Sequence, residues 1–407
     1  MTDYTRFLSA TGRQLTESAI RRMGTVVAQT RDVVSFAPGY PDPALFPWKE
    51  LREISAGLLD GHDADTLQYG PTRGYKPLLE SALHVLEARS VRATLEQLIV
   101  TSGSQQGIDL IARVLVSPGD VVLVELPTFT GAIAAFRNAQ AELVGIGLEH
   151  DGIDLERLDD AWQRAVGDGK TVKLLYLVPN FQNPTGSLLS LAKRPRVLEW
   201  AERRDVLVVE DDPYGLLYFE DVATEAETRP ICADDRTGRV LYLSTVSKML
   251  APGFRVGWMK APDMLIERFD TAKQSADLTS GILDQHIVHE ALRLGVADRL
   301  APQLRTLYRH KRDVMSQALR RGFGSRLTWA PPKGGFFIWA SVPDGVTDAA
   351  LLERALQHGV IFVAGSAFHV DGRGHDTIRL SFSAPSTDRI EEGASRLAAA
   401  LADFLGA

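Results

Sequence analysis

A lysine directly after a predicted buried strand is the first residue of this chain that could carry chemistry. Lys248 ends the segment STVSK (244–248), which follows the apolar run Val240–Ser244. A lysine amine at a strand end can attack a carbonyl carbon and form a Schiff base. Taken alone, the segment also fits an ordinary surface lysine. Arg255, seven residues further on, carries the forked guanidinium that can bind a phosphate through two hydrogen bonds.

Three carboxylates stand at the end of another predicted strand. Glu210 closes the run VLVVE (206–210), and Asp211 and Asp212 follow it. Such a cluster can bind a metal ion, act as an acid–base pair or pair with a cationic nitrogen. Because no histidine or second acidic cluster stands nearby at metal-ligand spacing, we predict no metal site and favour a carboxylate that pairs with a cationic nitrogen.

Two polar segments also follow predicted strands. The segment SGSQQG (102–107) lies between the strand-like run 98–101 and an apolar helix over 108–116. Small residues at a helix N-terminus leave backbone N–H groups free to bind a phosphate, although a serine-rich helix cap has the same sequence. The segment NPTG (183–186) is typical of a turn. An asparagine at the carboxyl end of a parallel strand would lie in the ligand crevice of an α/β sheet.

These residues need a scaffold of strands and helices that alternate. The runs 121–126, 173–178, 206–210 and 240–244 are apolar and β-branched, with helical patterns such as 189–204 between them. Strands separated by helices predict right-handed crossovers and a mostly parallel sheet that is covered on both faces. We therefore predict an α/β, doubly wound core over about residues 60–290.

The pattern changes at both ends of the chain. Beyond about residue 290, strand-like runs and helical segments predict a smaller α+β domain; the runs are 335–340, 359–363 and 378–383, and the helices are 300–321, 350–357 and 387–404. The first 60 residues are rich in proline and glycine and predict an arm with one helix near 17–29. We divide the chain into an arm that contributes to the small domain and a lid (1–60), a large domain (61–290) and a small domain (291–407).

Two further groups are interpreted as structural. The basic run Tyr308–Arg312 is predicted to form a solvated helix face in an acidic protein. His286 and His289 lie three residues apart on a predicted helix without a third metal ligand, so we expect them to pack rather than bind metal.

Composition excludes several classes of protein. The 407 residues are 45% hydrophobic and 24% charged, which is typical of a globular protein rather than a disordered or fibrous one. The net charge of −7 argues against general binding to nucleic acid or to an anionic membrane. No apolar stretch has the length of a signal peptide or membrane span, and the single cysteine, Cys232, leaves no internal disulfide. We expect a cytoplasmic protein with no membrane partner.

The order of the motifs resembles the fold-type I pyridoxal-phosphate aminotransferases of class I/II. The similarity is greatest to the subgroup of 2-aminoadipate and kynurenine aminotransferases, which is also found as the C-terminal domain of MocR-type regulators. The motifs that carry the resemblance are FAPGY (36–40), GSQQG (103–107), PTF (127–129), NPTG (183–186), DDPY (211–214), SK (247–248), GFRVGW (253–258) and RLSF (379–382). The resemblance implies a seven-stranded, mostly parallel large domain, a smaller domain, pyridoxal 5′-phosphate as cofactor, and a homodimer with shared active sites.

The resemblance also assigns roles residue by residue. Lys248 would bind the cofactor covalently and move a proton at the substrate, and Asp211 would pair with the ring nitrogen. Asp211 rather than Asp212 matches because it stands three residues before Tyr214. The other cofactor residues would be Ser104, Gln105, Thr245, Ser247 and Arg255 at the phosphate, Tyr69 at the phosphate of the neighbouring subunit, Tyr214 and Asn183 at the ring hydroxyl, and Phe129 on the ring face, where relatives often have tyrosine.

Substrate-binding roles follow from the same resemblance. Arg379 would bind the substrate α-carboxylate beside Asn183, and Gly39 in the arm would close over it. The side-chain pocket would draw on the arm, with Arg13, Arg21 and Tyr40 as candidates. By position Arg21 resembles the arginine that contacts side-chain carboxylates in the 2-aminoadipate enzymes, although an exposed helix residue fits its sequence context equally well.

The expected activity is transfer of an amino group from an L-amino acid to a 2-oxo acid, with 2-oxoglutarate as the default acceptor, by a ping-pong mechanism. An acidic or aromatic amino acid is the default donor. The alternative is another reaction of the same cofactor at an amino acid: elimination or replacement, decarboxylation, or oxidation. A third possibility is the ligand-sensing domain of a transcription regulator. That reading needs a winged helix before the arm, whereas this sequence begins at the arm, so we expect no nucleic-acid partner.

Overall fold

A large, mostly parallel sheet organises the computed structural model, which describes residues 2–15 and 32–406. Its strand order is β2-β9-β8-β7-β6-β3-β4-β5. The strands are β2 (Leu98–Thr101), β3 (Val121–Leu126), β4 (Glu142–Glu149), β5 (Gly152–Ile153), β6 (Val172–Leu177), β7 (Leu207–Asp211), β8 (Val240–Thr245) and β9 (Gly257–Lys260). The predicted α/β fold is confirmed: the five strands from β8 to β4 run parallel, and β9 is antiparallel to both of its neighbours. The two-residue β5 adds an eighth strand to the expected seven.

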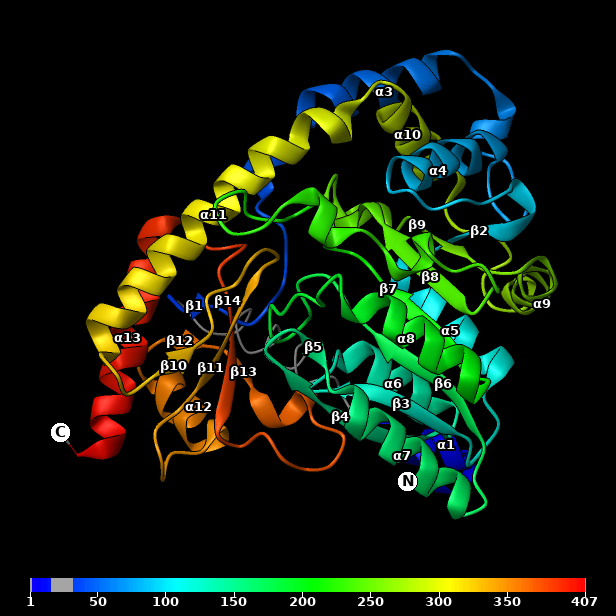
Figure 1. The fold of residues 1–407 in the computed structure, drawn as a ribbon. Coiled ribbons are helices and arrows are strands. Elements are labelled where there is room, and N and C mark those ends of the chain that lie inside the picture. Colours follow the sequence, from blue (N-terminus) through cyan, green and yellow to red (C-terminus); the bar gives the residue numbers. More distant parts are fainter. Residues whose placement is uncertain (1, 16–31, 407) are drawn as a thin grey trace.

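Helices cover both faces of this sheet, as alternating side chains require. In β3, Val122 and Val124 pack into one apolar cluster, whereas Val121 and Leu123 pack into the other. The first face is covered by α5 (Ser104–Leu115), α6 (Thr130–Asn138) and α9 (Asp263–Gln274). The second is covered by α7 (Leu155–Gly167) and α8 (Lys193–Arg204), with α4 (Lys76–Ala88) and α10 (Ile282–Arg293) further along the same cluster (Figure 1).

A second, smaller sheet lies beside the first. Its antiparallel order is β10 (Thr328–Trp329), β11 (Phe337–Ser341), β14 (Thr377–Ser381) and β13 (Val363–Ala364). A separate parallel pair joins β1 (Val34–Ser35), from the N-terminal arm, to β12 (Val360–Ile361). The expected strand 359–363 is therefore two short strands, which belong to different sheets.

The remaining helices connect the two sheets or cover the smaller one. The helix α11 (Val296–Phe323) runs from the end of α10 to α13 (Thr387–Leu405), and α12 (Asp348–Gln357) packs against α13 (Figure 1). Helix α1 (Ala10–Gln14) lies near the N-terminus, and α3 (Trp48–Asp60) packs on α10. The arm helix expected near 17–29 lies outside the described residues. None of the described helices combines the length and the apolar character that crossing a bilayer requires.

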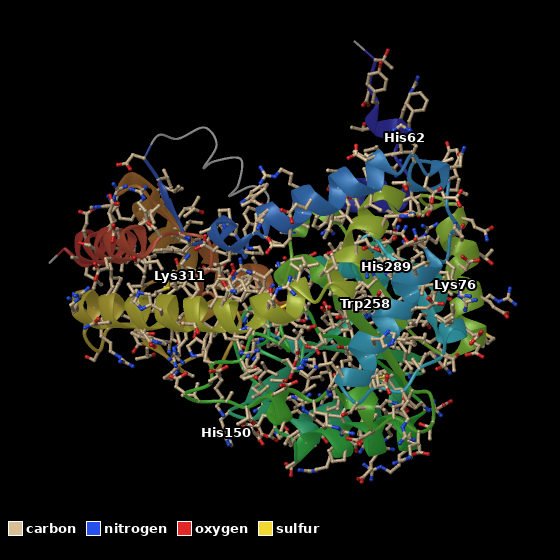
Figure 2. All side chains as sticks on the ribbon, turned by 90° about the horizontal axis from the view of Figure 1, so that it is seen from above. His62, Lys76, His150, Trp258, His289 and Lys311 are labelled. Atoms are coloured by element: carbon tan, nitrogen blue, oxygen red, sulfur yellow. The ribbon has the colours of Figure 1, made fainter. Side chains whose placement is uncertain are left out.

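The predicted solvated face at Tyr308–Arg312 is wrong. Tyr308, Lys311 and Arg312 are all buried, and Figure 2 shows Lys311 on α11. Lys311 pairs with Asp42 of the arm, and Arg312 pairs with Asp221. A charged run on a helix predicts a solvent-exposed face only when no distant segment supplies matching charges. Here two distant aspartates supply them.

The two histidines of α10 pack as expected. The ring of His286 stacks on Tyr75 with 3.8 Å between centroids, and His289 Nδ1 lies 2.8 Å from Ser81 Oγ. Among the residues that the structure describes, no cluster of histidine, cysteine and acidic side chains has the geometry to hold a metal ion.

Candidate active site

The candidate residues converge on the carboxyl edge of the large sheet. Asp211 is the last residue of β7, and Lys248 ends the short helix η7 (Val246–Lys248) directly after β8. These strands are neighbours in parallel register, with Asp211 opposite Leu243. Parallel strands present their carboxyl ends at one edge, which is where α/β sheets bind ligands.

The two adjacent aspartates have different surroundings. Asp212 is saturated: it accepts hydrogen bonds from Arg89 (3.0 Å), Asn180 (2.9 Å) and Tyr242 (3.0 Å). Asp211 accepts one hydrogen bond, from Tyr176 Oη at 2.8 Å, and its Oδ1 atom is buried with no donor among the described residues. Asp211 therefore has a free acceptor atom that faces the site, and Asp212 does not.

Burial raises the pKa of Asp211 to about 6, although the hydrogen bond from Tyr176 acts in the opposite direction and lowers it. A buried carboxylate with one unused oxygen is costly, and a cationic N–H donor would offset this cost. The pyridinium nitrogen expected from the sequence is such a donor. Tyr176 was not singled out from the sequence; the one signal there is a hydroxyl within the otherwise apolar end of the strand VKLLYL.

Lys248 is half-buried and its amine has no acidic partner among the described side chains. Lys248 Nζ donates to the carbonyl oxygen of Gly39 in the arm at 3.0 Å. It lies 5.9 Å from the ring centroid of Tyr214 and 5.7 Å from that of Phe336. Burial lowers the pKa of Lys248 to about 8, and the charges of Arg255 and Arg379 add to this effect. A lysine with a lowered pKa supplies the neutral amine that attack on a carbonyl needs.

A cradle of hydroxyl and guanidinium groups lies at the start of α5. Arg255 donates to the carbonyl oxygen of Ser102 at 3.0 Å, and its other terminal nitrogen lies 3.5 Å from Ser247 Oγ. Ser247 Oγ in turn lies 2.8 Å from Thr245 Oγ1. Ser104 opens the helix, and its buried Oγ has no hydrogen-bond partner among the described residues. Free N–H groups, hydroxyls and a guanidinium together suit a phosphate.

Gln105 and Phe129 lie at the side of this cradle. Gln105 is an exposed residue in the first turn of α5, and its side chain donates to the carbonyl oxygen of Gly131 at 3.0 Å. Phe129 caps α6, and a Cβ atom at Gly131 would stand 2.5 Å from its ring and 2.2 Å from Gln105 Oε1. Only glycine at 131 lets both side chains approach this close.

Arg379 is a buried cation without an acidic partner in the described structure. It donates to Asn183 Oδ1 at 2.8 Å and to the carbonyl oxygen of Ala37, and its Nε is buried without a partner. The guanidinium lies over the rings of Phe337 (4.2 Å) and Phe368 (5.0 Å). Burial lowers the pKa of Arg379 to about 9. These two phenylalanines were not singled out from the sequence, because an apolar ring in a strand is typical of any core.

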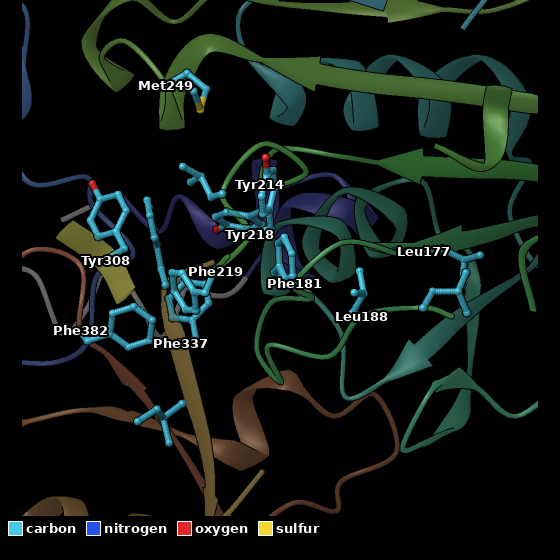
Figure 3. Packing of buried hydrophobic residues seen from close by; sticks show 14 of the residues in the cluster. Leu177, Phe181, Leu188, Tyr214, Tyr218, Phe219, Met249, Tyr308, Phe337 and Phe382 are labelled. Carbon is cyan, nitrogen blue, oxygen red and sulfur yellow. The ribbon is translucent and has the colours of Figure 1, made fainter. Parts of the chain in front are cut away.

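Tyr214 joins the Lys248 and Arg379 groups. Its ring packs edge-on against Phe336 and Phe337, with centroids 5.4 and 6.1 Å apart, and burial raises the pKa of its hydroxyl. Figure 3 shows Tyr214 and Phe337 in one aromatic cluster with Phe219, Phe382 and Tyr308. The aromatic layer excludes water from one side of the site.

Other candidates lie apart from this group or outside the description. Tyr69 is 79% exposed and Tyr40 is 54% exposed, and Arg13 is exposed on α1. The carbonyl oxygen of Tyr40 accepts a hydrogen bond from Ser383 Oγ at 2.7 Å. Arg21 lies outside the described residues.

Comparison with known proteins supports the same interpretation. Residues 43–397 match the family model described as "Aminotransferase class I and II". The chain is 38% identical over 97% of its length, and 94% of the relative's, to the aromatic-amino-acid aminotransferase 1 of Thermococcus litoralis. The crystal structure of Pyrococcus horikoshii kynurenine aminotransferase in complex with PMP is 37% identical, covers 100% of this chain and 99% of its own, and gives a TM-score of 0.93. The alpha-aminoadipate aminotransferase of Thermus thermophilus, complexed with N-(5'-phosphopyridoxyl)-L-leucine, is 35% identical over 100% of both chains, with a TM-score of 0.89.

Proposed function

Because this chain belongs to the class I and II aminotransferases, we propose that it moves an amino group from an L-amino acid to 2-oxoglutarate by a ping-pong mechanism at one site. It is a pyridoxal-phosphate enzyme of fold type I. The observation that carries the proposal is that Lys248, whose pKa is lowered to about 8, lies in the same site as Arg379, which is buried with no acidic partner among the described residues. One group can handle the amino end of an amino acid while the other binds its carboxylate.

The residues present fit the cofactor. Asp211 Oδ1 is the free buried acceptor that a ring N–H needs, and Ser104 Oγ is a free buried hydroxyl at the phosphate cradle. When bound, pyridoxal phosphate supplies an electron-withdrawing ring that stabilises negative charge on the substrate α-carbon. We assign the phosphate to Ser104, Gln105, Thr245, Ser247 and Arg255, the ring face to Phe129, and the ring hydroxyl to Tyr214 and Asn183. The phenylalanine at 129 omits the hydroxyl that a tyrosine would offer.

The catalytic roles follow from position and charge. Lys248 would hold the cofactor covalently in the resting enzyme, and its amine would then take the proton from the substrate α-carbon and deliver it to the carbon that receives the amino group. Asp211 keeps the ring nitrogen protonated, and Tyr176 holds the carboxylate in place at 2.8 Å. Arg379 orients the substrate by binding its α-carboxylate through two parallel hydrogen bonds, beside Asn183. The aromatic layer at Tyr214 and Phe337 keeps water away from the reacting carbon.

We further propose the assembly and substrates that the family pattern suggests. The arm (1–60), large domain (61–290) and small domain (291–407) act together in a cytoplasmic homodimer, in which Tyr69 reaches the phosphate of the neighbouring subunit. An acidic or aromatic amino acid is the donor, in keeping with the aromatic and aminoadipate activities that the relatives' names give. Arg13, Arg21, Gly39 and Tyr40 of the arm contribute to the substrate pocket.

A single-turnover experiment tests the reaction. The holoenzyme is mixed with each member of an amino-acid panel in the absence of any acceptor. A ping-pong aminotransferase releases one 2-oxo acid per active site and then stops until 2-oxoglutarate is added. Lys248→Ala is the control and should release none, because it lacks the amine that moves the proton. Continuous release of ammonia or carbon dioxide without an acceptor would instead support elimination, oxidation or decarboxylation.

A further inference from the structure

The arm crosses the active site as a segment that several hydrogen bonds hold in place. Phe36 N–H donates to Ile361, and Phe36 carbonyl oxygen accepts from Ser381 N–H, both at 2.8 Å. The next carbonyl, at Ala37, accepts from the Arg379 guanidinium. Residues 36 and 37 are thus fixed to β12 and to β14, the strand that carries Arg379.

One residue of the arm touches the catalytic lysine. Gly39 carbonyl oxygen accepts from Lys248 Nζ at 3.0 Å. A Cβ atom at this position would stand 2.6 Å from the ring of Phe337, so only glycine lets the arm lie this deep. Gly39 has no side chain with which to make contacts. Its position therefore depends on the residues that hold the arm further along the chain.

The next part of the arm, residues 40–42, is held by the buried part of α11. Asp42 N–H donates to Tyr308 Oη at 3.0 Å, and the Asp42 carboxylate pairs with Lys311 Nζ. Lys311 also donates to the carbonyl oxygen of Ser383 at 2.8 Å, while Ser383 Oγ donates to the carbonyl oxygen of Tyr40. Asp42, Lys311 and Ser383 therefore close a ring of contacts around the arm.

This ring is buried and its charges match. The Lys311 side chain is 2% exposed and that of Asp42 is 13% exposed. A charge pair in such a place is held only when its hydrogen bonds are satisfied, and Lys311 reaches both a carboxylate and a carbonyl oxygen. The pair has no contact with the cofactor cradle at Arg255 and α5, which lies at the large sheet.

We infer that Asp42 and Lys311 are positioning residues for the substrate-carboxylate site: they clamp the arm to α11, so that Ala37 holds the fork of Arg379 and Gly39 covers Lys248. The inference rests on the proposed function at one point, the role of Arg379 as the carboxylate ligand. Amino donor and 2-oxo acceptor share that ligand, so loss of the clamp weakens both substrates together and leaves cofactor binding intact.

The test compares two variants of the clamp with a neighbour on the same helix. Lys311→Met removes one charge, and the double variant Lys311→Met with Asp42→Asn removes both, so that no unpaired charge is left buried if the single variant folds poorly. Arg312→Met is the matched control: Arg312 is the next residue of α11, is buried, and pairs with Asp221 at 2.6 Å rather than with the arm. Lys311→Arg is the conservative variant, because it keeps a donor for Asp42 and Ser383.

Three measurements give the outcome. We expect KM for both donor and acceptor to rise about tenfold in the clamp variants, while kcat changes by less than about threefold and Lys311→Arg recovers most of the loss. The dissociation constant of pyridoxal phosphate, measured by absorbance on the apoenzyme, should stay within about twofold of wild type. Hydrogen exchange of peptide 36–42 should accelerate in the clamp variants and not in Arg312→Met.

Two results would overturn the inference. One is unchanged exchange of peptide 36–42 in the double variant, which would show that the clamp does not hold the arm. The other is an equal rise of KM in Arg312→Met, which would show a general effect of a lost buried charge. If wild-type enzyme lacks aminotransferase activity, the proposed function fails, and the exchange experiment still decides whether the clamp holds the arm.

Discussion

At the scale of single residues, two neighbouring aspartates have different roles, one structural and one chemical. Asp212 has three donors, one of which is the buried Arg89, whereas Asp211 keeps one oxygen unused. A saturated buried carboxylate contributes to folding, and a buried carboxylate with a free acceptor is prepared for a ligand. The number of donors separates the two roles where the sequence DD does not.

Exchange of each carboxylate for an amide should separate these roles experimentally. Asp211→Asn should fold normally and lower kcat by about a thousandfold or more, because an amide holds the ring nitrogen proton poorly. Asp212→Asn should instead cost about 3–5 kcal/mol of unfolding free energy, because it leaves Arg89 buried and unpaired. Steady-state kinetics and urea unfolding of both variants check this. Large loss of stability in Asp211→Asn with an active Asp212→Asn would reverse the assignment.

The amine of Lys248 should be available near neutral pH. Its pKa is lowered from 10.5 to about 8, mainly by burial and then by Arg255 and Arg379, so the neutral form grows as pH rises through about 8. The folded apoenzyme then carries the cost of the buried charge below pH 8 and regains stability between pH 8 and 10.5. The rate of covalent attachment of pyridoxal phosphate to the apoenzyme should rise with a midpoint near 8.

Arg379→Met provides the control for that titration. Because the charge of Arg379 lowers the pKa of Lys248, its removal should shift the midpoint of cofactor attachment to higher pH. A midpoint near 10.5 in wild-type protein would contradict the effect of burial.

Some residues of the site could be identified from the sequence, and others could not. Lys248, Asp211 and Arg379 were identifiable because each stands in a motif at a strand, and motif order carries the resemblance. Lys311 was not, because a charged run on a helix has the same pattern whether it meets water or a distant aspartate. Asp42 stands 269 residues away in the chain, so only the fold reveals the pair.

At the scale of elements, the junction of β2 and α5 forms the cradle that we propose for the phosphate. Gly103 caps α5 with φ of +73°, a left-handed conformation that favours glycine. A Cβ atom there would stand 2.6 Å from Arg255 Nη2. The backbone turn and the place of Arg255 therefore depend on the same glycine.

Gly103→Ala should weaken cofactor binding through Arg255. We expect pyridoxal phosphate to bind the apoenzyme about ten- to a hundredfold more weakly, because the new methyl group displaces the guanidinium from the phosphate. Gly119→Ala is the matched control: Gly119 also has positive φ (+87°), but a Cβ atom there meets nothing within 4 Å. Both variants should lose similar stability from backbone strain, and only Gly103→Ala should lose cofactor affinity. Equal affinity in the two variants would exclude a role for Arg255 displacement.

The strands of the large sheet could be predicted where burial on both faces makes their sequences uniformly apolar. The runs at β3, β6, β7 and β8 are buried throughout or nearly so, and their bounds agree with prediction within a residue or two. β4 was missed because it lies near the sheet edge, is partly exposed and contains two glycines. β9 was missed because it is only four residues long, its first two residues belong to the GFRVGW motif, and one of its two antiparallel neighbours, β2, is distant in sequence.

At the scale of the whole molecule, several large apolar side chains remain on the surface of one chain. Leu67 is 69% exposed and Tyr69 is 79% exposed, on the segment before α4, and Leu278 is 47% exposed on the loop after α9. Thr279 Oγ1 donates to the carbonyl oxygen of Pro71, which brings these two segments together. Apolar side chains that cluster on a surface are typical of an interface, and here they favour the proposed homodimer.

Mixing two inactive variants tests whether the sites are shared. Lys248→Ala lacks the amine, and Tyr69→Ala lacks the side chain proposed to reach the neighbouring phosphate. After subunit exchange, half of the dimers should be mixed and one of their two sites should be wild type, so about a quarter of wild-type activity should return. Each variant alone and an unexchanged mixture are the controls. No recovery, with mixed dimers present by mass spectrometry, would show that Tyr69 serves its own chain.

The length of α11 has a mechanical consequence. Its 28 residues form a rod of about 42 Å. Lys311 stands about 24 Å along it from Gly295, the residue of positive φ at which the helix begins. A swing of about 10° at that glycine would carry Lys311, with the arm attached, through about 4 Å, which is the width of a small substrate group. Because residues 36 and 37 of the arm are hydrogen-bonded to β12 and β14, such a swing would have to carry these strands along with the arm to uncover Lys248.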